Sequence, residues 1–139
     1  MSSQIRFSQF ALPQFLISQF LVEDTAIQGP GEGPVFDTRV FDGHPFSIIL
    51  GITHAIEQES LEIDLLASDD GVNWQSRPVF SFPPKYYCGT YEASLAQLRE
   101  RYVKPVWRAS RWARGDDKPF FRFYLLAQPV RVKAMAGAA

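Results

Sequence analysis

The chain is 139 residues long, carries a net charge of −1 and is 46% hydrophobic, which is ordinary for one globular domain with its own core. Its single cysteine, Cys88, excludes a disulfide within the chain, and its longest apolar run is too short to span a bilayer. The start lacks the layout of a signal peptide, and the sequence leaves the location open between the cytoplasm and an assembled particle.

Residues 1–28 form an apolar segment with a five-residue repeat. A glutamine recurs every five residues from Gln4, and each is followed by an apolar side chain: Ile5, Phe10, Phe15 and Phe20. A period of five fits neither the 3.6 residues of a helical turn nor the two of a strand. So many apolar side chains must be buried, either on their own domain or on a neighbour. The pattern predicts an extended N-terminal arm that contacts a partner through its phenylalanines.

The stretch 29–34, GPGEGP, cannot hold regular structure and is predicted to be a hinge. Residues 35–133 are predicted to be the main domain, and residues 134–139 a loose tail. Within the domain, strands bounded by turn signals are expected at 35–41, 46–53, 61–68, 78–82, 86–91, 102–110 and 120–127. The strand over 102–110 is expected to break at Pro105, and a capping box at 94–97 predicts a short helix through Arg101.

The clearest of these strands runs into a turn between Leu61 and Trp74. Apolar Leu61, Ile63 and Leu65 alternate with acidic Glu62 and Asp64, which is the signature of a half-buried strand. The sequence Ser-Asp-Asp-Gly that follows is typical of a tight turn. Several such strands with one helix predict an all-β fold, an antiparallel β-sandwich or jelly roll with an extended N-terminal arm.

Two families share this pattern. The turn 67–74, ASDDGVNW, and the later Arg101-Tyr102-Val103-Lys104 resemble discoidin-type, galactose-binding-like jelly rolls. With the closing strand FFRFYLLA at 120–127, the chain is also similar to small β-sandwich proteins of phage virions. The shared part covers about residues 61–127, and the flanking cysteine pair of many discoidin domains is missing. The resemblance implies a jelly-roll fold; no recognition-loop residues can be carried across.

Candidate catalytic and metal-binding residues are few. Asp69 and Asp70 lack the further acidic residues of a calcium site, and His44 and His54 lack zinc partners at ligand spacing. Cys88 paired with a histidine would make a nucleophile, but its tyrosine-rich neighbourhood favours a buried thiol. The tripeptide Arg114-Gly115-Asp116 is interpreted as a turn. We therefore predict no catalytic residue, no metal and no cofactor, and a protein that is not an enzyme.

Charge is distributed unevenly along the chain. Residues 1–98 hold 4 basic and 12 acidic residues, a net of −8, whereas residues 99–139 hold 10 basic and 3 acidic, a net of +7. In one interpretation, acidic and basic strands pair within a sheet. In the other, opposed faces favour head-to-tail association or an anionic partner.

The segment 99–118 interleaves basic residues with Tyr102, Trp107 and Trp112. Such a mixture stacks on single-stranded nucleic acid or sugars, or docks an acidic neighbour. Alternatively, Trp107 is a core residue and the arginines pair with Glu62 and Asp64, while Trp112 lies exposed in a loop. The predicted partner-binding residues are Phe10, Phe15, Phe20, Arg108, Arg111, Trp112 and Arg114.

These features favour a structural or assembly subunit that associates with itself or within a larger complex. Its arm would dock on a neighbour by strand addition, and charged faces would set the orientation. The alternative is a discoidin-like carbohydrate-binding module acting through Trp74, Trp112 and loop tyrosines. A single-stranded nucleic-acid binder ranks third, and would lose binding steeply with salt.

Overall fold

The computed structural model describes residues 17–95, 98–115 and 118–129. These residues form nine strands and one short 3-10 helix, and none of the described helical structure is long and apolar enough to cross a membrane. The elements are β1 (Gln19–Ile27), β2 (Gly31–Glu32), β3 (Phe36–Asp37), η1 (Thr38–Phe41), β4 (Phe46–Ala55), β5 (Glu59–Ser68), β6 (Phe80–Lys85), β7 (Gly89–Leu95), β8 (Tyr102–Arg111) and β9 (Phe121–Pro129).

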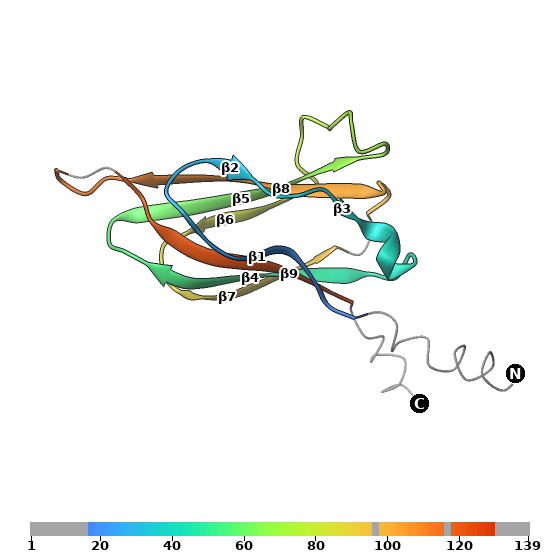
Figure 1. The fold of residues 1–139 in the computed structure, drawn as a ribbon, viewed down its shortest axis with the longest axis horizontal. Helices are drawn as coiled ribbons and strands as arrows, with labels where there is room; N and C mark the ends of the chain where they lie inside the picture. Colours follow the sequence, from blue (N-terminus) through green and yellow to red (C-terminus); the bar gives the residue numbers. More distant parts are fainter. Residues whose placement is uncertain (1–16, 96–97, 116–117, 130–139) are drawn as a thin grey trace, which may run out of the picture.

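The strands make two antiparallel sheets that stack face to face (Figure 1). Sheet A has the order β1-β9-β4-β7, and sheet B has the order β2-β8-β5-β6 with β3 also paired to β8. Most connections cross from one sheet to the other, which is the jelly-roll form of the sandwich. The predicted all-β sandwich is therefore confirmed.

The core lies between the sheets and follows from the alternation of each strand. In β5, Leu61, Ile63 and Leu65 are fully buried, and Phe121, Phe123 and Leu125 of β9 face them from sheet A. β4 lies between β9 and β7, and its successive residues are buried on both faces over most of its length, which matches its almost continuous apolar run. Trp107 of β8 packs edge-on against Phe123, with ring centroids 5.3 Å apart, which confirms its expected place in the core.

The described part of the predicted arm belongs to the sandwich. β1 pairs with β9 from Gln19↔Ala127 to Ile27↔Phe121, and Leu21 and Val22 are buried. A boundary at residue 28 therefore does not separate the arm from the domain, because residues 19–27 form one edge of sheet A. Phe10, Phe15 and the predicted tail 134–139 lie outside the described residues.

The predicted hinge is a packed strap that closes one side of the sandwich. β2 pairs with β8, and the backbone N–H of Gly33 donates to the carbonyl of Pro105 at 2.9 Å. A Cβ on Gly33 would lie 2.8 Å from the Pro105 ring and 2.9 Å from Val22, so only glycine allows this close approach. The Gly/Pro composition therefore marks close packing here, not the free hinge that we expected.

β8 runs unbroken through Pro105, contrary to the expected break. The Pro105 carbonyl points to the gap between β2 and β3, where it accepts from Gly33. The nitrogen of Pro105, which carries no hydrogen, faces the same gap, because the N–H and C=O of one residue in an antiparallel strand point to the same side. No ladder hydrogen bond to β5 is lost.

The short helix lies elsewhere than predicted. Ser94 and Leu95 belong to β7, where Leu95 is buried opposite Phe46, and residues 98–100 have no regular structure. Burial in the sheet outweighs the local capping signal. Instead, η1 follows β3 in the stretch that was expected to be a strand.

Candidate protein-interaction surface

Three aromatic side chains gather at one end of the sandwich, where Figure 1 shows the β4–β5, β6–β7 and β8–β9 connections close together. We call this the turn end, and its aromatic end surface consists of Tyr86, Tyr87 and Trp112. Their exposed fractions are 45%, 76% and 56%. The Tyr86 and Trp112 rings lie 6.3 Å apart at 73°, and the Tyr86 and Tyr87 rings 6.3 Å apart at 56°. Contiguous exposed aromatic side chains typically mark an interaction site.

The β4–β5 turn fixes Trp112 in this position. The backbone N–H of Trp112 donates to the Gln58 carbonyl at 2.9 Å, and Nε of Arg111 donates to the Glu57 carbonyl at 3.1 Å. The fully buried Glu59 holds the same turn, since its carboxylate accepts from the N–H groups of Ile56 and Phe120, both at 2.7 Å. The end of β8 is thus tied to the body of the sandwich.

The tyrosine pair comes from the β6–β7 turn. Residues 86–88 form this turn, not the strand that we expected, and β7 begins only at Gly89. The Tyr91 hydroxyl donates to the Tyr87 carbonyl at 3.2 Å, and Nζ of Lys85 lies 4.2 Å from the centre of the Tyr91 ring. Cys88 is exposed in this turn, so the prediction of a buried thiol is wrong.

The predicted partner-binding residues divide among three regions. Arg111, Trp112 and Arg114 lie at the turn end, where the expected exposure of Trp112 is confirmed. Arg108 lies on the outer face of sheet B. Phe20, 53% exposed, packs edge-on against Tyr124 at 6.0 Å near the opposite end of sheet A.

Charge pairing across strands explains the uneven charge distribution. Arg108 forms ion pairs with Glu62 at 2.9 Å and with Asp64 at 2.8 Å. Burial raises the pKa of Asp64, but hydrogen bonds from Ser81 and Arg108 outweigh it and leave that pKa lowered. Other pairs likewise join a basic residue of the second half to an acid of the first: Arg101–Asp37, Lys104–Glu32 and Arg122–Asp24. The interpretation that acidic and basic strands pair is therefore confirmed for these residues.

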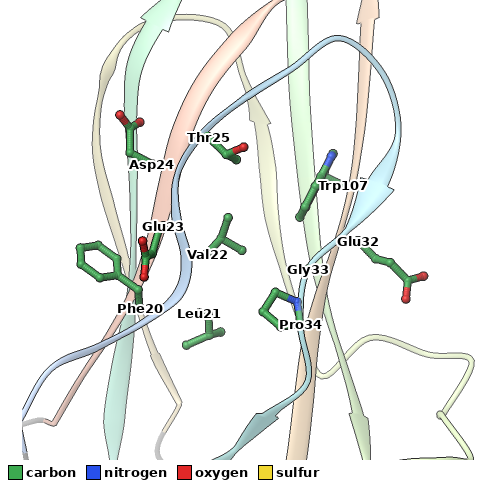
Figure 2. Close-up of a pocket in the computed structure, with 10 residues that line it drawn as sticks. All are labelled: Phe20, Leu21, Val22, Glu23, Asp24, Thr25, Glu32, Gly33, Pro34 and Trp107. Carbon is green, nitrogen blue, oxygen red and sulfur yellow. The ribbon is translucent and has the colours of Figure 1, made fainter.

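A groove of about 550 Å³ lies along the open edge between β1 and the strap (Figure 2). Its walls include the apolar side chains of Val22 and Trp107. Two of its carboxylates are engaged in ion pairs, Asp24 with Arg122 at 2.7 Å and Glu32 with Lys104 at 3.2 Å. The groove presents apolar surface at the sandwich edge and brings together no acid–base pair.

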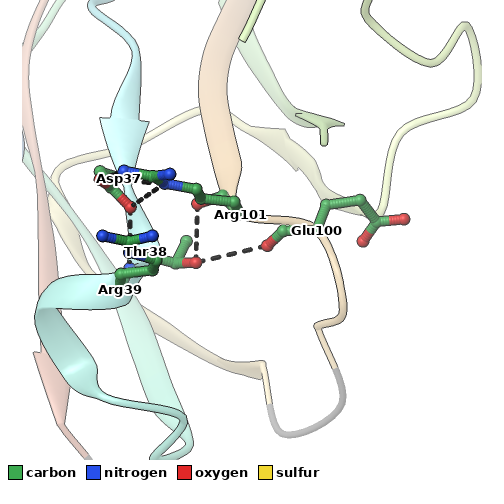
Figure 3. Close-up of polar contacts among 5 residues, drawn as sticks. All are labelled: Asp37, Thr38, Arg39, Glu100 and Arg101. Atoms are coloured by element: carbon green, nitrogen blue, oxygen red, sulfur yellow. Dashed lines mark hydrogen bonds and ion pairs between the residues drawn. The ribbon is translucent and has the colours of Figure 1, made fainter. Parts of the chain in front are cut away.

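A polar cluster fastens η1 to the connection between β7 and β8 (Figure 3). The Arg101 side chain donates to both carboxylate oxygens of Asp37, and the pair lies 3.0 Å apart. Thr38 Oγ1 donates to the Arg101 carbonyl at 2.7 Å, while Asp37 accepts from the Arg39 N–H and caps η1. The Arg101 hydrogen bond lowers the pKa of Asp37 despite some desolvation. This network is structural, because its groups satisfy one another.

The Ser68–Trp74 turn is also self-contained. Asp70 accepts from the backbone N–H groups of Asn73 and Val72, both at 2.8 Å, which holds the pKa of its carboxyl far below the usual range. In the described residues no three metal-ligating side chains cluster. Trp74 lies beside Lys104, whose Nζ is 4.7 Å from its ring. It therefore does not join Trp112 and the tyrosines in one surface.

Sequence reasoning did not place Tyr86 and Tyr87 among the candidate partner-binding residues, although both are exposed beside Trp112. The signal was present, because the aromatic pair lies in the short stretch 85–88, between the chain breakers Pro83-Pro84 and Gly89. A comparison with models of known protein families finds no match, and no curated protein matches the sequence.

Proposed function

We propose that the protein is a non-enzymatic structural subunit that assembles with neighbouring protein subunits. One observation carries this proposal: apolar side chains are exposed at both ends of the sandwich. Tyr86, Tyr87 and Trp112 lie at the turn end, while Ile17 and Phe20 mark the other end, where the apolar segment 1–16 joins β1. A subunit with apolar surface at both ends is suited to contacts that bury one end on a neighbour.

The charge pattern supports a refined form of this proposal. Arg101, just before β8, and Arg108 of β8 are ion-paired within the sandwich, so charged faces contribute less to association than the sequence suggested. Apolar contact is then the main source of affinity, and aromatic side chains are frequent hot spots of interfaces. The jelly-roll fold hosts both virion subunits and lectins, and does not itself decide between them.

Light scattering over a concentration series tests the proposal directly. The full chain should form a discrete oligomer or a polymer, and Trp112→Ala and Tyr87→Ala should each weaken that association. The matched control is Val72→Ala, because Val72 is 77% exposed but lies in the β5–β6 connection, away from both surfaces. A monomer at every concentration would contradict self-assembly.

A second candidate is a carbohydrate-binding module that uses the aromatic end surface. The exposed rings of Trp112, Tyr86 and Tyr87 favour it, since sugars stack on aromatic faces. However, these rings are inclined by 56° and 73°, so they form no flat platform. A glycan array decides between these outcomes: binding that disappears in Trp112→Ala would support the module, and an array without hits would eliminate it.

The third candidate function is single-stranded nucleic-acid binding. Such a binder would lose affinity steeply between low and physiological salt.

A further inference from the structure

Among the described strands, β7 alone offers a long and regular free edge. The other exposed edges are blocked: β1 has register shifts on both sides of Val22, β2 and β3 have two residues each, and β6 contains Pro83 and Pro84. β7 ends sheet A, contains no proline, and pairs with β4 without a bulge from Gly89↔Ile52 to Leu95↔Phe46. Its outer backbone groups are therefore suited to accept another strand.

The side chains of β7 define what such a strand must look like. Tyr91, Ala93 and Leu95 point toward the core, while Thr90, Glu92 and Ser94 are exposed. Glu92 is the middle residue of β7 and its only charged one. A matching strand needs apolar residues opposite the first set, and a basic residue among polar ones opposite the second.

The start of this chain has that pattern. Residues 3–9 are SQIRFSQ, and Arg6 at their centre is the only charged residue before Glu23. With Arg6 opposite Glu92 in an antiparallel pair, Ile5 faces Ala93 and Phe7 faces Tyr91, whereas polar Ser3 falls opposite Leu95, so the apolar match holds at two of the three core-facing positions. The polar residues match too, since Gln4 then lies opposite Ser94 and Ser8 opposite Thr90. Phe10 falls opposite Cys88, beside the aromatic end surface.

We propose that residues 3–9 of a second copy of this chain add to the free edge of β7 as an antiparallel strand, with Arg6 opposite Glu92. This inference rests on the proposed function and names its contact. It makes the arm and the aromatic end surface two parts of one interface, because Phe10 and the residues after it continue onto Tyr86 and Tyr87.

The geometry requires the arm of a second copy. In Figure 1 the described chain starts beside the end of β9, level with Leu95 across the sheet. From there to a strand beside Cys88, a chain must cross four strand spacings and the length of β7, a diagonal of about 30 Å. The seven Cα–Cα steps from Phe10 to Ile17 span at most about 25 Å. A chain cannot place its own arm in this register.

The native Cys88 provides a direct test in the full-length protein. Phe10→Cys should form an intermolecular disulfide with Cys88 under mild oxidation, seen as a dimer or larger species on a non-reducing gel and as a linked 10–88 peptide by mass spectrometry. Ser8→Cys combined with Thr90→Cys should link as well in a Cys88→Ser background, because these two positions lie opposite each other in this register, and the combination retains every aromatic side chain. Adding Cys88→Ser to Phe10→Cys should abolish the 10–88 link. Ser2→Cys is the matched control, because the antiparallel register places it at the far end of β7.

Four results would overturn the inference. A 10–88 disulfide within a monomer would show that the arm binds its own domain. A link from Ser2→Cys in place of Phe10→Cys would show a parallel strand. No link from Phe10→Cys, and none from Ser8→Cys with Thr90→Cys, in a protein that light scattering shows to be oligomeric, would leave the proposed function standing and remove this contact from it. A monomer at every concentration would overturn both proposals.

A charge exchange checks the register independently. Glu92→Arg places two arginines opposite each other and should weaken association roughly three- to tenfold, whereas the double variant Arg6→Glu, Glu92→Arg should restore it. Thr90→Arg also adds a positive charge to β7. In this variant Arg6→Glu should restore association less, because residue 90 does not lie opposite residue 6. Equal restoration at both positions would contradict the assigned register.

Discussion

Asp37 and Arg101 form a bidentate ion pair, 3.0 Å apart, between the start of η1 and the start of β8. Both side chains are about one-third exposed, at 37% each. The pair nevertheless has a structural consequence, because Asp37 also caps η1 and so orients the turn that leads Phe41 into the core. It joins two segments that are distant in sequence near one end of the sandwich.

The Asp37–Arg101 pair should make stability depend on acidity. The Arg101 hydrogen bond lowers the pKa of Asp37 in the folded state, so the unfolded chain binds a proton more readily. The stability that the Asp37–Arg101 pair contributes is fully present above the ordinary aspartate pKa of about 3.9, and it disappears as pH falls through the lower pKa of folded Asp37. Asp37→Asn should therefore be modestly less stable than the wild type at neutral pH, and the difference should disappear in acid, below the folded pKa of Asp37.

Urea unfolding across this range measures the difference. Arg101→Gln should lose a similar amount and show the same convergence in acid, and the double variant should lose no more than either single one. A constant difference between Asp37→Asn and the wild type at all pH values would contradict this account. Additive losses in the double variant would show that the two side chains act separately.

Glu59 should be a stability determinant of the turn end. Its buried carboxylate accepts hydrogen bonds from two backbone N–H groups, those of Ile56 and Phe120. Glu59→Ala leaves both donors without this partner, and should lower the free energy of unfolding by about 2–5 kcal/mol. Glu59→Gln keeps one acceptor oxygen but turns an amide toward the other donor, so its loss should be intermediate. Unfolding curves in urea rank the three proteins, and a fully stable Glu59→Ala would contradict the assignment.

Gly51 should tolerate no side chain while Tyr124 is present. The two residues are paired across β4 and β9, and a Cβ at position 51 would overlap the Tyr124 ring. Gly51→Ala should therefore lower the free energy of unfolding by about 1–3 kcal/mol. In a Tyr124→Ala background the ring is gone, and the same substitution should be neutral or slightly stabilising, because glycine is a poor strand former. An equal cost in both backgrounds would rule out the ring as the cause.

The sequence predicted the central strands because burial there follows local alternation. Leu61, Ile63 and Leu65 repeat every second residue, and the apolar run from Phe46 matches a strand covered on both edges by neighbours. Predictions failed where a tertiary contact outweighed local preference. The pairing of Leu95 with Phe46 outweighed the helix signal of the capping box at 94–97, and Gly31 and Gly33 of the strap reflect packing against Trp107, Pro105 and Val22.

The candidate surface was only partly predictable. Trp112 follows a strand and precedes a turn, so its exposure could be inferred from its position. Tyr86 and Tyr87 were assigned to a strand because aromatic residues favour strands in general. Their place in a turn depends on where β6 leaves sheet B and β7 enters sheet A, which no local pattern encodes. The contact between Tyr86 and Trp112 is set by this crossing.

Two truncations should separate folding from assembly. Removing residues 1–16 deletes the arm and leaves β1 intact, so this variant should unfold at the same urea concentration as the full chain but remain monomeric in light scattering. Removing residues 1–28 also deletes β1, which exposes the edge of β9 and uncovers core contacts of Leu21 and Val22. This longer truncation should be strongly destabilised or aggregate. If it instead folds with the stability of the shorter one, β1 is not an integral strand of the sandwich. If the shorter one assembles like the full chain, the arm plays no part in assembly.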